Sequence, residues 1–142
     1  MDRSVHTRLP WQDAQWERLN RARHQGRLPH ALLFSGPRGV GKERFALALA
    51  QSLLCRECDA DGRPCGVCRH CHLLHSGGHP DIQWVGPDAE SKSGEIKIDR
   101  IRALAGGANL TTQSGGYKLV VIQAPVRPCI SRCARTTLAP KA

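Results

Sequence analysis

The stretch ALLFSGPRGVGK, residues 31–42, decides the fold. Its first four residues form a continuous apolar run, which is typical of a buried parallel strand. The segment that follows, residues 42–54 (KERFALALAQSLL), is rich in good helix formers. A Gly-x-x-x-x-Gly-Lys pattern between a strand and a helix predicts a phosphate-binding loop, because its backbone N–H groups and its lysine can approach phosphate oxygens. A glycine turn with a chance lysine is the weaker interpretation, since both flanking elements are present.

The residues that ATP hydrolysis requires are missing from this loop. The Ser or Thr that holds Mg²⁺ after the lysine is replaced by Glu43, whose longer carboxylate repels phosphate. Hydrolysis also needs an acidic residue at the end of a neighbouring strand, whereas the run at residues 117–122 (YKLVVI) ends in Gln123. We therefore expect a remnant phosphate loop that could bind ATP without hydrolysing it. Its residues are Gly36, Gly39, Gly41 and Lys42.

Strand and helix patterns alternate along the first 123 residues. Residues 11–23 have helical spacing, with Trp11, Ala14, Leu19 and Ala22 expected on one apolar face. Residues 82–85 (IQWV) and 117–122 indicate further strands, and apolar residues from Ile98 onward follow a helical spacing. This order predicts an α/β fold with a parallel sheet, and residues 1–123 are expected to form one P-loop domain.

The segment from Cys55 to His79 interrupts this pattern with five Cys and four His. The steps Cys65-x-x-Cys68-x-x-Cys71 allow thiolates to turn onto one ion, and an upstream cysteine would complete a tetrahedron. Either Cys55 or Cys58 could be that ligand. Zinc suits such a site best, and an iron–sulfur or redox cluster is the lesser alternative. Further candidate ligands are His70, His72, His75 and His79.

Composition limits the function classes further. The net charge of +9 is compatible with a nucleic-acid partner or with a solvated basic surface, and the charges are scattered. With aromatic residues at 4%, a base-stacking platform for single strands is not expected. The first 16 residues lack the apolar core of a secretion signal, and no apolar run is long enough for a membrane span, so we expect a cytoplasmic protein.

Several motifs together resemble the clamp-loader subunits of bacterial DNA polymerase III, which are AAA+ proteins. These are LPHALLF at residues 28–34, the glycine loop, the cysteine knuckle, GHPD at residues 78–81, and Ile98-Asp99-x-Ile101-Arg102. The resemblance covers residues 8–123, and it is greatest to the non-motor delta-prime type, whose nucleotide site is often degraded. It implies that the zinc ligands are Cys55, Cys65, Cys68 and Cys71.

The resemblance also implies a role in loading the sliding clamp onto primed DNA. The implied partners are the motor and delta subunits and, through them, the clamp and the DNA. An ATP-hydrolysing motor subunit and a free zinc-knuckle nucleic-acid binder are the alternatives. We expect the chain itself to be non-catalytic within a polymerase holoenzyme.

Residues 124–142 do not resemble this family. They contain no acidic residue and show no clear periodicity. We therefore expect the sheet to be truncated after its third strand, and residues 124–142 to form an atypical tail that a frameshift would explain. In the family a fourth strand lies between the first and the third, and its loss would leave both with unpaired backbone groups.

Overall fold

The computed structural model describes residues 8–87, 96, 98–108, 112–113, 116–123 and 134–139. The chain divides into two compact units, which are described separately. One unit comprises residues 1–29 and 43–79, and the other comprises residues 30–42 and 80–142. No helix in the described part of the chain is long and apolar enough to cross a membrane.

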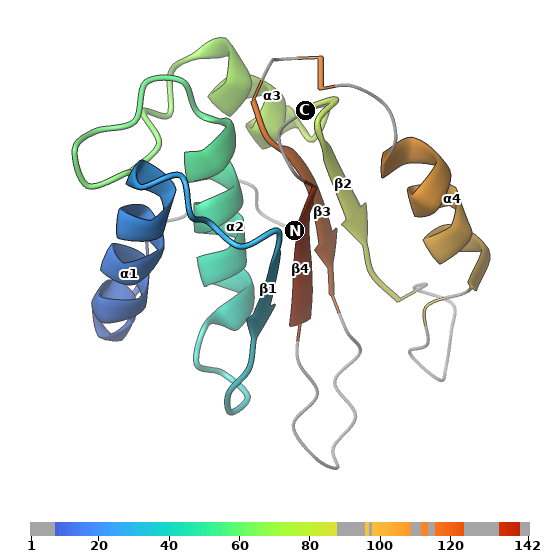
Figure 1. Ribbon diagram of the computed structural model, residues 1–142, viewed down its shortest axis with the longest axis horizontal. Helices are drawn as coiled ribbons and strands as arrows, with labels where there is room; N and C mark the ends of the chain where they lie inside the picture. The colour runs from blue at the N-terminus through green and yellow to red at the C-terminus, as the bar shows by residue number, and fades with distance from the viewer. Residues whose placement is uncertain are drawn as a thin grey trace. The chain divides into compact units, whose positions relative to one another are not determined.

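The first unit is helical (Figure 1). It contains the 3-10 helix η1 (Pro10–Gln12), α1 (Asp13–His24), α3 (Arg69–Ser76), and all but the first residue of α2 (Lys42–Leu54). Trp16 is the buried residue of α1, at 3% exposure, and its ring meets the Phe45 ring edge-on at 5.8 Å between centroids. The predicted apolar face is therefore only partly right: Leu19 and Ala22 are half-buried, whereas Trp11 is 59% exposed and Ala14 is also exposed.

The second unit carries the sheet, which contains β1 (Ala31–Phe34), β2 (Ile82–Val85), β3 (Lys118–Ile122) and β4 (Ala134–Ala139). The order across the sheet is β1-β4-β3-β2 (Figure 1). Strands β2 and β3 are parallel, as predicted, and Leu119 in β3 is completely buried. The same unit contains α4 (Ile98–Ala108).

The tail changes the predicted topology. Its strand β4 lies between β1 and β3 and pairs antiparallel with both, so the expectation of a sheet truncated after the third strand is wrong. β3 ends at Ile122 and β4 begins at Ala134, and this short separation in sequence favours an antiparallel pair over a parallel one, which requires a crossover of about a dozen residues or more. The prediction that β1 is a buried parallel strand is also wrong, since among the described strands β1 pairs only with β4, in antiparallel orientation, and its residues are exposed or half-buried.

Candidate metal centre and phosphate loop

Three structural elements bring four cysteines together in the helical unit. Cys55 directly follows α2, and its N–H bonds to the Gln51 carbonyl 2.9 Å away, which continues the helical hydrogen-bond pattern by one residue. Cys68 caps the N-terminus of α3, and Cys71 lies in the first turn of that helix. The fourth, Cys65, comes from the loop between α2 and α3.

The four sulfur atoms lie within 4.8 Å of one another. The Cys55 sulfur is 3.6 Å from that of Cys65 and 3.9 Å from that of Cys68, and the Cys65 and Cys71 sulfurs are 3.9 Å apart. Four thiolates around one zinc ion, each at about 2.3 Å from the metal, would be separated by about 3.8 Å. The spacing therefore fits a tetrahedral metal ion, and the cluster could bind a metal.

Backbone groups also support this arrangement. The N–H of Cys65 points to the Cys55 sulfur at 3.4 Å, and the N–H of Cys68 points to the Cys65 sulfur at 3.3 Å. Such donors stabilise the negative charge that thiolate ligands carry. The chain thus supplies both the sulfur atoms and part of the polar environment that a bound dication requires.

The structure distinguishes between the two upstream cysteines. Cys58 lies outside the cluster, and its thiol donates to the Ser52 carbonyl at 3.1 Å. Two of the candidate histidines interact with each other instead of with the cluster: His70 Nδ1 and His79 Nε2 are 3.0 Å apart, and His79 is buried. Among the described residues, the cluster consists of the four cysteines that the family resemblance implied.

Burial affects the protonation of the thiols. It raises the pKa of Cys55, and it raises the pKa of Cys71 to about 11. The pKa of Cys68 is lowered to about 7: burial acts against this shift, and hydrogen bonds from the backbone and thiol of Cys71 outweigh it. A metal ion must therefore displace protons from Cys55 and Cys71 when it binds.

The glycine loop lies in the second unit. Gly36, Gly39 and Gly41 all have positive φ, at 151°, 85° and 82°. The Lys42 ammonium turns back over the loop and donates to the carbonyls of Gly36 and Pro37 at 2.8 and 2.7 Å. A phosphate group would have to draw Lys42 away from these carbonyls before the lysine could neutralise it.

Glu43 and Gln123 occupy the two positions where ATP hydrolysis would need a hydroxyl and a carboxylate. Glu43 is exposed in the first turn of α2. Gln123 directly follows β3, is exposed, and its N–H bonds to the Val85 carbonyl at 2.7 Å. The carboxyl end of β3 therefore presents an amide where metal-assisted hydrolysis needs a carboxylate.

The structure defines a mixed α/β protein whose helical unit carries four clustered cysteines. The family model described as "DNA polymerase III, delta subunit" matches residues 11–126, so the chain belongs to this family.

Curated relatives give the same answer. The chain is similar to the DNA polymerase III subunit delta' of Pseudomonas aeruginosa, with 41% identity over 115 residues (80% of this chain and 33% of that protein). It is 43% identical to the Bacillus subtilis delta' subunit over 96 residues (68% and 27%). Over 104 residues (73% and 17%) it is 38% identical to the gamma/tau subunit of Mycobacterium tuberculosis. The chain spans about a third of the length of the delta' relatives it matches.

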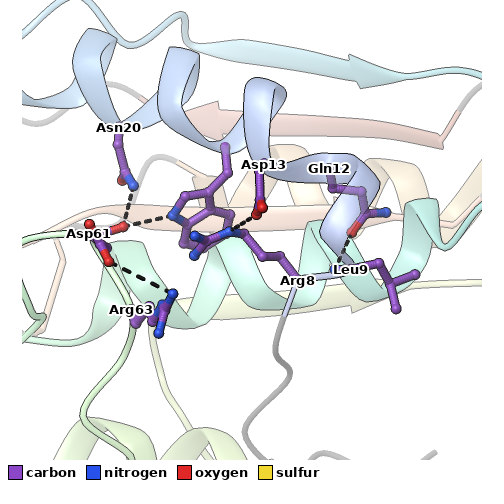
Figure 2. Close-up of polar contacts among 8 residues, drawn as sticks. Arg8, Leu9, Gln12, Asp13, Asn20, Asp61 and Arg63 are labelled. Carbon is purple, nitrogen blue, oxygen red and sulfur yellow. Dashed lines mark hydrogen bonds and ion pairs between the residues drawn. The ribbon is translucent and has the colours of Figure 1, made fainter.

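Sequence reasoning missed the residues that hold the loop between Cys55 and Cys65. The indole of Trp16 and the amide of Asn20, both on α1, donate to the Asp61 carbonyl (Figure 2). The hydroxyl of Ser52 donates to the Gly62 carbonyl. A sequence pattern that could have indicated them is the spacing of three side chains with hydrogen-bond donors, Trp16, Asn20 and Arg23, which share one face of α1.

Proposed function

We propose that this chain is the front part of a non-motor subunit of the DNA polymerase III clamp loader, which acts in the cytoplasm and helps place the sliding clamp on primed DNA. The observation that carries the proposal is the family match across residues 11–126 in a chain that has Glu43 beside its phosphate-loop lysine. The relatives named delta' support the non-motor assignment.

In this proposal the cysteine cluster holds a structural zinc ion. A site with four protein thiolates has no open position for water or substrate, so the metal would fix the fold and would not act in catalysis. The ligands are Cys55, Cys65, Cys68 and Cys71, whose spacing supports a tetrahedral ion. The metal would join the end of α2 to the start of α3, a segment that has few apolar residues to stabilise it otherwise.

The phosphate loop is proposed as a remnant formed by Gly36, Gly39, Gly41 and Lys42. It retains the backbone and the cation for holding phosphate. It lacks a hydroxyl for Mg²⁺ at Glu43 and an acid at Gln123, so bound ATP would not be hydrolysed. The subunit would then contribute to the clamp loader by binding its partner subunits and would not contribute by hydrolysing ATP.

The proposed partners are the motor and delta subunits, and through them the clamp and primed DNA. Reconstitution of this chain with the motor and delta subunits of its source organism tests the proposal. We expect a stoichiometric complex by size exclusion, and we expect the substitution Glu43→Ala to leave the ATP turnover of that complex unchanged. Failure to co-elute would contradict the assignment. Loss of turnover on Glu43→Ala would favour an ATP-hydrolysing subunit.

A further inference from the structure

Two consecutive carbonyl groups hold the loop at residues 56–64, which joins Cys55 to Cys65. The Asp61 carbonyl accepts hydrogen bonds from Trp16 Nε1 at 2.7 Å and from Asn20 Nδ2 at 2.5 Å. Figure 2 shows Asn20 reaching this carbonyl from α1. The Gly62 carbonyl accepts from the Ser52 hydroxyl of α2 at 2.5 Å. Side chains of two helices therefore fix the middle of the loop.

Ser52 is itself held by α1. Arg23 Nη1 donates to the Ser52 hydroxyl oxygen at 2.8 Å and to the Ser52 carbonyl at 3.2 Å. Ser52 is 1% exposed, so the loss of one of these partners would leave a polar group buried. Trp16, Asn20 and Arg23 are four and three residues apart and thus line one face of α1.

The loop also folds on itself at the same place. The Asp59 N–H bonds to the Arg63 carbonyl, and the Arg63 N–H bonds to the Asp59 carboxylate at 2.7 Å. Gly62 has φ +73°, and a Cβ placed on it would come within 2.3 Å of the Asn20 amide oxygen. The turn reverses the chain so that the Cys65 sulfur reaches 3.6 Å from that of Cys55.

We propose that Trp16, Asn20 and Arg23 are positioning residues for the metal centre, so that the docking of α1 and the binding of metal are coupled. The inference rests on the proposed zinc site. A metal ion held by Cys55 and Cys65 would keep the loop closed, and the closed loop presents its carbonyls to the donors of α1. By thermodynamic linkage, the free energy with which α1 stabilises the closed loop also strengthens metal binding by the same amount.

The test compares the zinc affinity of the full chain with that of two variants of α1. Asn20→Ala removes a donor to the loop, and Gln15→Ala removes an exposed amide from the same helix as a matched control. Competition with a chelator of known affinity gives the dissociation constant for zinc. Since Asn20→Ala removes one net hydrogen bond, we expect its dissociation constant for zinc to rise by about 3- to 10-fold. Gln15→Ala should change the constant by less than about twofold, because exposed substitutions have small effects.

A second measurement separates positioning from general stability. Melting temperatures are compared with zinc bound and with zinc removed, for Asn20→Ala and for Trp16→Phe, which keeps an aromatic ring against Phe45 and loses the indole donor. If α1 and the metal site are coupled, both variants should lower the melting temperature of the zinc-bound form more than that of the zinc-free form.

Two outcomes would overturn the inference, and they differ in what else they affect. Equal falls in both forms with an unchanged dissociation constant would show that α1 stabilises the fold alone, and the zinc site itself would stand. If the wild-type chain binds no zinc, the metal centre and this inference fail together.

Discussion

The substitution Gly62→Ala should destabilise the protein more than an ordinary glycine replacement does. Gly62 is buried and has φ +73°, in the left-handed region, where a side chain costs about 1–2 kcal/mol. Its new Cβ would also lie 2.3, 2.7 and 2.8 Å from three atoms of the Asn20 amide. Asn20 must therefore move and lose its bond to the Asp61 carbonyl, which adds about 0.5–1.5 kcal/mol. We expect a total loss of about 1.5–3.5 kcal/mol.

The chain contains a matched control for this change. Gly26, just after α1, has φ +65° and nothing within 4 Å of its Cβ position, so Gly26→Ala should show the conformational cost alone. Urea unfolding of both variants with zinc bound gives the two free energies. In an Asn20→Ala background, the cost of Gly62→Ala should fall to the level of Gly26→Ala. If Gly62→Ala and Gly26→Ala cost the same in the wild-type background, the described packing of the loop against α1 is wrong.

Three further predictions concern the two sites. Cys65→Ser should abolish stoichiometric zinc, measured by elemental analysis, whereas Cys58→Ser should retain it; zinc loss in the Cys58 variant would contradict the ligand set. Because burial raises the pKa of Cys55 and raises that of Cys71 to about 11, zinc binding near neutral pH should release at least two protons, and affinity should weaken as pH falls. Calorimetry in buffers of different ionisation enthalpy measures that release, and its absence would contradict the proposed ligand protonation. Glu43→Thr alone should not create ATP turnover, since Gln123 still supplies no carboxylate; turnover in this variant would show that the missing hydroxyl was the sole defect.

Local patterns in the sequence predicted the elements around the glycine loop well. The strand at residues 31–34, the helix at 42–54 and the strand at 82–85 occur at the predicted positions. Each is a run with one dominant local pattern, which fixed its position in the chain, although β1 is less buried than that pattern predicted. Helix α3 was missed because its sequence, RHCHLLHS, is mostly polar, and it ends at Gly77 with φ 77°.

Long-range features were harder to predict. The predicted apolar face included Trp11, which lies in η1, and omitted Trp16, which is buried in α1 and donates to the Asp61 carbonyl 45 positions further along the chain. Strand β4 was missed because its sequence, ARTTLA, has little apolar character, and its place depends on the unpaired edges of β1 and β3. The cysteine spacing left Cys55 and Cys58 equivalent, and the geometry favours Cys55 because Cys58 donates to Ser52.

We propose that this chain is a zinc-stabilised, non-motor subunit, and an assay of ATP turnover on a sample with quantified zinc is the sharpest test of that proposal. The assay would compare the wild-type chain with the Lys42→Ala variant, in the presence of Mg²⁺ and of primed DNA. We predict one zinc per chain and no turnover above that of Lys42→Ala. Turnover that disappears in Lys42→Ala would contradict the claim, because it would show a working phosphate loop.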